Sequence, residues 1–550
     1  MSQRNYLQTV SEQIVVFDGG MGATLEQFDL TSEDYGGLPG KCHEALILHR
    51  PDVIQGVHET MLDAGAIVLE TDTFQASRIK LEEWGLADHT EEINVKAAEI
   101  ARAAAGPDRF VAGSIGPTGH LPASDDPTLG KIRFDELVTV FTEQAAGLVN
   151  GGADLIIIET AQDILEVKAA MFGARAAFEQ TGRTLPIQTS VSLLPNGGKM
   201  LLGTDISAVL TTLHALGADV IGLNCSTGPE DMRDAIRFLG EFCPVPVACI
   251  PNAGLPLQGP DGETIFPEDP EPLAATLGEF VERYGVGIVG GCCGTTPEHI
   301  AAIAARVDGL TPGERPAPGQ IQVSSMMTAT PLVQEPRPTL VGERVNSQGS
   351  KKAKELLLAD DYDGLLQVAE DQVEGGAHVL DLCVALTERD DEDVQMATVA
   401  ERVSLTQPAP IQVDSTEPGV IEAALEKIPG RAIVNSINLE AGEDKADVVV
   451  PIAVAHGAAL IALTIDEVGM AKTAERKLEI AQRLREIACE RHGLDPEALI
   501  FDALTFTLTT GDEEWRPSAV ETIEGIRRIK AEIPGVKLSL IHISEPTRPY

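Results

Sequence analysis

The chain has 550 residues, of which 43% are hydrophobic and 23% charged, a composition typical of a soluble protein that is too long for a single core. Its formal net charge of −44 at pH 7 disfavours nucleic acids and anionic membrane surfaces as partners, because both carry charge of the same sign. Neither a membrane-spanning stretch nor the apolar core of a secretory signal is visible, so we expect two domains in the cytoplasm.

Short runs rich in valine and isoleucine recur along residues 1–308, and each is followed by a longer helix-like stretch. The eight runs begin at Ile14, Ala66, Phe110, Asp154, Pro186, Ala218, Pro244 and Gly285. Runs that are apolar throughout suit parallel strands buried on both faces. Eight strand–helix units predict an α/β fold of the (β/α)8, or TIM-barrel, type, with a doubly wound sheet as the alternative.

Three cysteines stand where predicted strands end. Cys225 follows the sixth run, and Cys292 and Cys293 follow the eighth in the segment GGCCGTTPEH. Because all strands of a barrel end on one face, we expect the three thiols to converge. In a reducing compartment such a group indicates zinc with one open position, suited to holding an incoming thiol as a thiolate. The alternative is that the three cysteines are small buried residues that pack near strand ends. His299 could be a fourth ligand, but its place in the first turn of a predicted helix favours a residue on the helix face.

These cysteines, together with DGGMG from Asp18, ETDTF from Glu70 and IIET ending at Thr160, resemble the homocysteine-binding domain of zinc-thiolate methyltransferases. The resemblance implies that the three cysteines bind zinc and that the homocysteine sulfur takes the open position. It also implies that the amino-acid end of homocysteine is held by Asp18, Gly19, Thr71 and Glu159. Strand-end carboxylates can pair with an ammonium group, and glycines allow close approach of a carboxylate, although turn glycines and helix-capping acids are the alternatives.

Residues 309–338 are rich in proline and small polar residues, so we expect a partly extended interdomain linker. Strand-like runs resume at Thr339, His378, Pro410, Ala432, Ala459, Leu499 and Val536. They predict a second barrel over residues 339–540 that lacks its eighth strand. The final stretch from Ser539 resembles a translated sequencing adapter, so we expect the chain to be a fragment and assign no function to residues 541–550.

Acids and amides end the strands of the second half, and they resemble the pterin-binding domain of corrinoid methyltransferases. The resemblance implies pterin contacts from Glu343, Asp414, Asn435 and Asp502, with Asn346 nearby. Asp381 and Asp466 are either further contacts or supporting acids. Two departures stand out: Cys383 replaces an asparagine of the family, and the asparagine expected near N5 after the seventh strand is missing.

The order of the two domains resembles the N-terminal half of the cobalamin-dependent methionine synthase family. The resemblance implies that homocysteine is methylated to methionine, with 5-methyltetrahydrofolate as the donor and cobalamin as the carrier. The chain has no Asp-x-His-x-x-Gly pattern, so we expect the cobalamin-binding module outside it. Two other functions are a corrinoid-independent methyltransferase that uses betaine or S-methylmethionine, and a non-catalytic module that binds homocysteine or folate.

Overall fold

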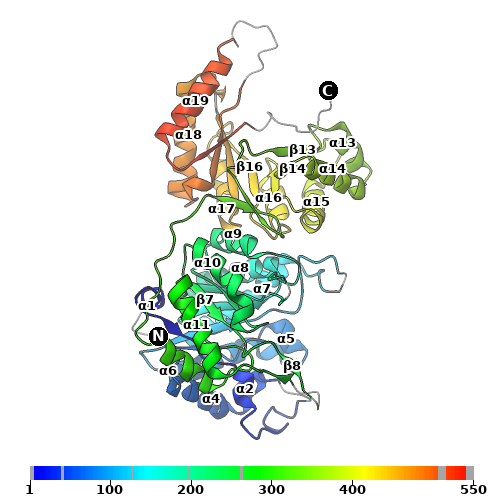
Figure 1. The fold of residues 1–550 in the computed structure, drawn as a ribbon. Coiled ribbons are helices and arrows are strands. Elements are labelled where there is room, and N and C mark those ends of the chain that lie inside the picture. Colours follow the sequence, from blue (N-terminus) through cyan, green and yellow to red (C-terminus); the bar gives the residue numbers. More distant parts are fainter. Residues whose placement is uncertain are drawn as a thin grey trace. The chain divides into compact units, whose positions relative to one another are not determined.

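The computed structural model describes residues 5–38, 42–126, 128–195, 197–259, 264–505 and 516–540. The chain forms two compact units, Met1–Gly319 and Gln320–Tyr550 (Figure 1). Each unit is an α/β body with its own parallel sheet. No helix in these described ranges is long and apolar enough to cross a membrane.

The first unit is built on eight parallel strands. They are β1 (Val15–Val16), β2 (Val68–Glu70), β3 (Phe110–Ile115), β4 (Leu155–Ala161), β5 (Ile187–Val191), β6 (Val220–Asn224), β7 (Val247–Ile250) and β10 (Ile288–Val289). They pair in the order β1-β10-β7-β6-β5-β4-β3-β2, and a parallel bridge between Phe17 and Val68 joins the two ends. The predicted barrel is therefore confirmed, and an open doubly wound sheet is excluded.

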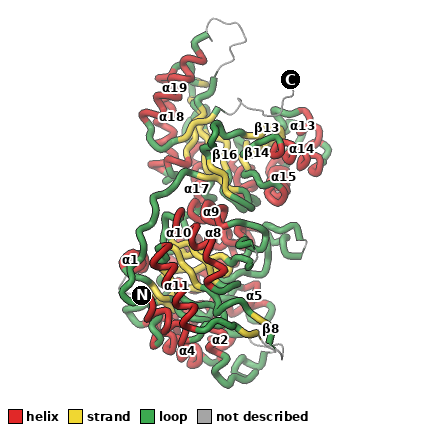
Figure 2. The backbone as a smooth tube through the Cα atoms, in the orientation of Figure 1, coloured by secondary structure: helices red, strands yellow, loops and turns green. Residues whose placement is uncertain are grey.

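Helices surround these strands (Figure 2). They are α1 (Tyr6–Glu12), α2 (Met21–Leu25), α3 (Glu44–His49), α4 (Pro51–Asp63), α5 (Arg78–Glu82), α6 (Thr90–Ala105), α7 (Phe134–Gly151), α8 (Ile164–Thr181), α9 (Ile206–Ala215), α10 (Pro229–Phe242), α11 (Pro270–Tyr284) and α12 (Pro297–Val307). Proline occupies the first turn of α10, α11 and α12, where its missing N–H costs nothing. A short hairpin, β8 (Leu257–Gln258) and β9 (Thr264–Ile265), follows β7.

The interior of the first barrel is filled from one end by α1. Tyr6 and Val10 of this helix pack with Phe110 and other residues that lie near the beginnings of the strands. The Tyr6 hydroxyl donates a hydrogen bond of 2.7 Å to Oε1 of Gln188. The end of the barrel at which the strands begin is therefore closed, and only the opposite end is available for a site.

The described residues of the second unit form seven parallel strands. They are β13 (Val341–Asn346), β14 (Val379–Cys383), β15 (Ile411–Asp414), β16 (Ile433–Ile437), β17 (Ala459–Leu463), β20 (Leu499–Asp502) and β21 (Lys537–Ser539). They pair in sequence order, so β13 and β21 form the two ends of the sheet within the described residues. The seven predicted strands are confirmed, and residues 541–550, for which we predict an artefactual tail, lie outside the described ranges.

Helices connect successive strands of the second unit. They are α13 (Lys351–Leu358), α14 (Tyr362–Glu374), α15 (Glu392–Thr406), α16 (Pro418–Leu425), α17 (Asp444–Ala455), α18 (Ala474–Arg485) and α19 (Ser518–Glu532). A π-helical turn, Glu486–Arg491, extends α18. A small hairpin of β18 (Ile465–Asp466) and β19 (Gly469–Met470) follows β17.

Part of the segment expected to be a linker has regular structure. β11 (Gln322–Ser324) and β12 (Ala329–Pro331) form an antiparallel hairpin. Val323 is fully buried in the core of the second unit, and the Ser324 hydroxyl accepts a hydrogen bond of 2.8 Å from the backbone of Arg431. The hairpin belongs to the second unit because its apolar side chains, spaced two residues apart, have a core to pack against.

Candidate active site

Three thiols meet at the open end of the first barrel. Cys225 directly follows β6, and Cys292 and Cys293 lie in the loop between β10 and α12. Their Sγ atoms all lie within 4.8 Å of one another, and those of Cys225 and Cys293 are 3.7 Å apart. Within the described ranges, this is the one group of three or more His, Cys, Asp or Glu side chains with metal-binding spacing.

The donor set fits zinc. Zn–S bonds of about 2.3 Å in a tetrahedron place two sulfurs about 3.8 Å apart, close to the separation of Cys225 and Cys293. Hydrogen bonds from Cys292 and Cys293 lower the pKa of the Cys225 thiol to about 3. The hydrogen bond shared with Cys225 raises the pKa of Cys292 well above its usual value and that of Cys293 to about 12. A divalent cation bound by the three sulfurs would favour the thiolate form of each.

The loop that follows β7 holds both cysteine segments in place. The backbone N–H of Cys292 donates to the carbonyl of Pro251 at 2.8 Å, and that of Cys293 donates to Oδ1 of Asn252 at 3.1 Å. The N–H of Asn252 donates in turn to the carbonyl of Thr227, two residues after Cys225. We did not predict a role for Asn252 from the sequence, although its place directly after an apolar run is a signal that could have revealed it.

Glycine at position 20 is a steric requirement of the cysteine loop. A Cβ atom at Gly20 would lie 2.6 Å from the carbonyl oxygen of Cys292. That oxygen accepts a hydrogen bond of 2.6 Å from the Thr295 hydroxyl, which itself accepts one of 3.0 Å from the N–H of Gly20. Gly19 is also crowded, since a Cβ there would lie 3.1 Å from Cε of Met61. The DGG motif therefore lies directly against the loop that carries the paired cysteines.

His299 forms hydrogen bonds at the start of α12 and is not positioned by the structure as a fourth zinc ligand. Its Nδ1 accepts from the backbone N–H of Thr296 at 3.1 Å and forms the reciprocal half of a capping box at the start of α12. Its Nε2 lies 3.0 Å from the carbonyl oxygen of Glu268. The histidine thus connects α12 to the segment before α11, as a helix residue.

Two predicted carboxyl groups are buried inside the barrel beside the thiols. Oδ2 of Asp18 accepts a hydrogen bond of 3.0 Å from the backbone of Glu70. Glu159 accepts from the Ser114 hydroxyl at 2.5 Å and from Nδ2 of Asn224 at 3.0 Å. Burial raises the pKa of Asp18 well above its usual range and that of Glu159 to about 7. A cationic group entering this space would favour the ionised form of both acids.

Asn224 links the carboxyl groups to the cysteines. Its side chain donates to the Thr160 hydroxyl at 2.8 Å and accepts from the Thr160 N–H at 2.7 Å. Both Thr160 and Cys225 have positive φ angles, 54° and 59°, a conformation that costs free energy in non-glycine residues. The amide of Asn224 therefore stabilises the bent backbone at Thr160. Its position directly before Cys225 was the available sequence signal.

Thr71 directly follows β2 and is buried. Its hydroxyl accepts a hydrogen bond of 3.0 Å from the N–H of Ser114 and shares another of 2.6 Å with Thr73. Ser114 is the residue that donates to Glu159. The structure therefore connects Thr71 to the predicted carboxyl group through Ser114.

The second unit gathers polar side chains at adjacent strand ends. Nδ2 of Asn346, at the end of β13, donates to Asp381 at 2.8 Å and to Asp414 at 3.1 Å. Gln412 donates to the other oxygen of Asp381 at 2.7 Å. Burial and the neighbouring charge of Asp381 raise the pKa of Asp414 to about 7. Asp381 thus fits the role of a supporting acid for Asn346.

The other predicted residues of this half lie along the same edge or within a strand. Asn435 is paired in register with Asp414 and is buried. Asp502 ends β20, is buried, and accepts a hydrogen bond of 2.8 Å from the N–H of Leu504. The ammonium group of Lys477 donates to the carbonyl of Leu504 at 3.1 Å and so helps to hold this turn. Glu343 lies inside β13, three residues before Asn346.

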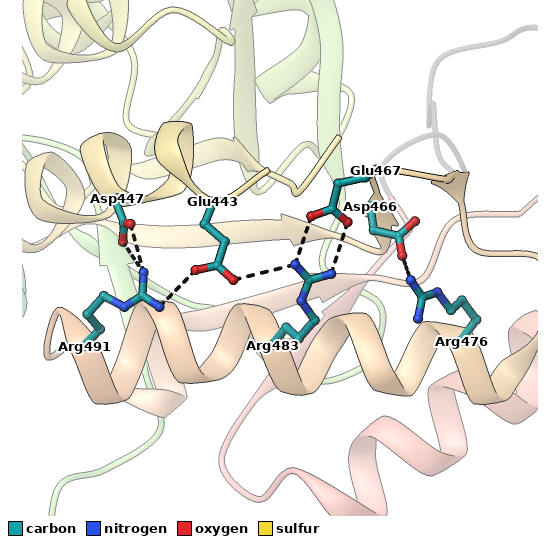
Figure 3. Close-up of polar contacts among 7 residues, drawn as sticks. All are labelled: Glu443, Asp447, Asp466, Glu467, Arg476, Arg483 and Arg491. Carbon is teal, nitrogen blue, oxygen red and sulfur yellow. Dashed lines mark hydrogen bonds and ion pairs between the residues drawn. The ribbon is translucent and has the colours of Figure 1, made fainter. Parts of the chain in front are cut away.

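Asp466 belongs to a row of ion pairs (Figure 3). It is buried and pairs with Arg476 of α18. Further along α18, Arg483 pairs with Glu467 at 3.0 Å, and Arg491 of the following π turn pairs with Glu443 at 3.0 Å. Asp466 therefore anchors α18 to the strand-end loop, which suits a supporting acid better than a ligand contact.

Comparisons with known proteins agree with this arrangement. The family model of homocysteine S-methyltransferases matches residues 15–307, and that of pterin-binding enzymes matches residues 342–543. The methionine synthases of Mycobacterium leprae (strain TN) and Mycobacterium tuberculosis (strain ATCC 25618 / H37Rv) are 41% and 42% identical to the chain over 97% of its length. The chain spans 45% of the length of each of these relatives.

Among solved structures, the metallated form of the homocysteine methyltransferase MmuM from Escherichia coli is 25% identical to the chain, with a TM-score of 0.43. That match covers 54% of this chain and 96% of the other. The homocysteine S-methyltransferase model alone covers more than half of the chain. The chain therefore belongs to the homocysteine S-methyltransferase family, and its second unit matches the pterin-binding enzymes.

Proposed function

We propose that this chain carries the homocysteine-binding and folate-binding parts of a methionine synthase. In this proposal the first unit binds zinc and homocysteine, the second binds 5-methyltetrahydrofolate, and a cobalamin-binding module outside this chain carries the methyl group. The observation that supports it most is that three converging sulfurs lie beside buried carboxyl groups. Asn224, the residue before Cys225, donates a hydrogen bond to one of these carboxyl groups, that of Glu159. An amino acid with a terminal thiol is the ligand that matches both halves of this site.

Each residue of the first site has a chemical role in the proposal. Cys225, Cys292 and Cys293 hold zinc, which when bound would keep the substrate thiol ionised at neutral pH. Asp18 and Glu159 accept hydrogen bonds from the substrate's ammonium group. The backbone of Gly19 lies against the substrate's carboxylate, while Thr71, through Ser114, orients Glu159.

In the second unit, the strand-end polar groups match the donor and acceptor edge of a pterin. Asp414, Asn435, Asp502 and Glu343 contact the ring in this proposal, and Asn346 keeps Asp414 in position. A carboxylate can accept two N–H groups from an aminopyrimidine edge. The identity to methionine synthases over nearly the whole chain supports pairing this site with the thiol site in one enzyme.

The cobalamin module and the cytoplasmic location belong to the same proposal. The relatives are more than twice as long as this chain, which leaves room in them for a carrier module. A cytoplasmic location suits a trio of cysteine thiols, because such compartments keep thiols reduced.

The first test measures zinc and homocysteine binding. Wild type is titrated with zinc beside Cys292→Ser, and proton release is then followed as homocysteine is added. We expect one zinc per wild-type chain and proton release at neutral pH, with zinc affinity lowered at least about tenfold in Cys292→Ser. Cys489→Ser, a half-buried cysteine of the second unit, is the matched control. Equal zinc binding by wild type and Cys292→Ser would remove the metal site from the proposal.

The second test follows methionine formation by the zinc-loaded chain. We expect methionine to form from homocysteine when methylcobalamin is added. Formation from betaine or S-methylmethionine without corrinoid would instead favour the one-barrel type of homocysteine methyltransferase. Binding of homocysteine with no methionine from any of the three donors would favour a non-catalytic binding module.

The third test addresses the folate site through the pH dependence of binding. The ionised Asp414 is the form that accepts N–H groups, and its pKa lies at about 7, so affinity for 5-methyltetrahydrofolate should rise between pH 6 and pH 8. Asp414→Asn should bind at least about tenfold more weakly and lose this pH dependence. The exposed Asp363→Asn is the control, and an identical pH profile in Asp414→Asn would contradict the assignment.

A further inference from the structure

The interior of the first barrel contains polar atoms without hydrogen-bond partners. They are Oε1 of Glu70, Nε2 of Gln188 and Oγ of Ser190, and all three are buried. Buried polar atoms in folded proteins are almost always paired, either with protein groups or with bound molecules. Three such atoms inside one barrel are therefore groups that a polar ligand could satisfy.

The strand pattern shows that Glu70 faces this interior. Val68 of β2 and Ile157 of β4 both belong to the interior core. Side chains two residues apart on a strand point to the same face, so Glu70 and Glu159 face inward as well. Glu70 retains some accessible surface. For an inward-facing residue, that surface opens toward the mouth of the barrel.

Gln188 and Ser190 extend the same polar surface across the barrel. Oε1 of Gln188 accepts the hydroxyl of Tyr6, whose ring lies in the interior core, so Gln188 also faces inward. Ser190 lies two residues further along β5 and shares this face. Both residues have no exposed surface. Unpaired polar atoms of this kind are usually satisfied by a bound polar molecule, and here they lie on the same inner face as Glu70.

Glu70 is close to both carboxyl groups that we assign to the substrate. Its backbone N–H donates to Oδ2 of Asp18 at 3.0 Å. Burial and the nearby charges of Glu159 and Asp18 raise the pKa of its side chain well above the usual range. Three carboxyl groups this close together and largely shielded from water are costly to ionise, and one cationic group among them removes much of that cost.

We infer that Glu70 is a third carboxyl group that binds the ammonium end of the thiol substrate, together with Asp18 and Glu159. An ammonium group has three N–H donors, and this arrangement offers one carboxyl acceptor to each. Glu70 thereby makes the site specific for amino-acid thiols over thiols that lack the amino group. The inference rests on the proposed function of the first unit.

The test compares two thiols that differ only in the amino group, homocysteine and 4-mercaptobutanoate. Calorimetric titration of the zinc-loaded full chain gives the dissociation constant of each thiol for wild type and for Glu70→Gln. We expect the variant to bind homocysteine at least about tenfold more weakly, because a charged hydrogen bond is lost. Binding of 4-mercaptobutanoate should change less than about twofold, since that ligand has no ammonium group.

Two further variants keep the test decisive. Glu166→Gln removes a buried carboxyl group that bonds to Thr118 outside the pocket, and it should leave both dissociation constants unchanged. Glu70→Asp keeps the charge on a shorter side chain, so it should bind homocysteine more tightly than Glu70→Gln does. Equal weakening of both thiols, or no weakening of homocysteine binding, in Glu70→Gln would overturn the inference. If wild type with zinc bound neither thiol, the proposed function itself would fail.

Discussion

Gly20 shows how a single missing side chain shapes the thiol site. The space beside it is filled by the carbonyl oxygen of Cys292, only 2.6 Å from where a Cβ atom would lie. Gly20→Ala should displace the cysteine loop and lower zinc affinity at least about tenfold, because the geometry of the ligands sets that affinity. Competition with a chromogenic chelator measures the change.

The control for this prediction is Gly56→Ala in α4. A Cβ atom there meets no atom within 4 Å, so zinc affinity should stay unchanged. Alanine in a helix interior should also stabilise the protein by about 1 kcal/mol. Unchanged zinc affinity in Gly20→Ala would show that the cysteine loop tolerates the displacement.

His58 makes the first unit sensitive to acid. Its ring is fully buried in α4 and neither nitrogen has a hydrogen-bond partner, so burial lowers its pKa from 6.5 to about 4. The pKa of His58 is lower in the folded protein than in the unfolded chain, so the unfolded chain binds the proton first as the pH falls. The free energy of unfolding is therefore highest above pH 6.5 and decreases as the pH falls toward 4. Between pH 7.5 and pH 5 this loss amounts to about 2 kcal/mol.

The measurement is urea unfolding of wild type and His58→Met at both pH values. Methionine fills a similar apolar space and carries no proton. We expect the free energy of unfolding to fall by about 2 kcal/mol more in wild type than in the variant over this range. Equal pH dependence in the two proteins would mean that His58 does not titrate on unfolding.

At the scale of elements, the two sheets differ in how they end. The first sheet is joined across β1 and β2 by the bridge between Phe17 and Val68. In the second sheet, the described part of β21 pairs only with β20. An unpaired strand edge exposes backbone groups to water, and its hydrogen bonds open locally more often than those of a central strand.

The rates of amide hydrogen exchange should therefore differ between the edge strand and the central strands of the second unit. We expect the amides of Lys537–Ser539 to exchange at least about 100-fold faster than those of β15, which is paired on both sides. Strands β1 and β2 of the closed barrel serve as the reference for slow exchange. Equal protection of β21 and β15 would show that another segment or a partner covers this edge.

At the scale of the whole molecule, all of the predicted zinc ligands belong to one unit. Cys225, Cys292 and Cys293 lie within Met1–Gly319. A ligand that binds only the folded state stabilises that state, by about 2.7 kcal/mol at a concentration of 100 times its dissociation constant. Zinc should therefore raise the melting temperature of the first unit by several degrees and leave that of the second unchanged.

Differential scanning calorimetry with zinc and with a chelator checks this expectation. Cys292→Ser assigns the transitions, since the zinc-dependent shift should disappear in that variant. A single transition that moves as a whole with zinc would show that the two units unfold together.

The sequence by itself determined the strands and their number. Every apolar run in residues 1–308 became a strand of the closed barrel, and all seven in the second half became strands of the second sheet. The reason is that a parallel strand covered by helices on one face and packed on the other must be apolar along its length. The cysteines and several acids could also be placed at strand ends, since their positions follow from where each run stops.

Only the tertiary structure decided which of these residues meet and what supports them. Gly20 and Thr295 form a hydrogen bond although 275 positions separate them in the sequence. Asn224 and Glu159 form another across a separation of 65 positions. Likewise, the hairpin inside the proline-rich segment depends on a core built from residues far along the chain. A local pattern records whether a side chain is buried and on which face it lies. It does not record its neighbours, because these are set by the closure of the barrel, which brings together strands that are distant in sequence.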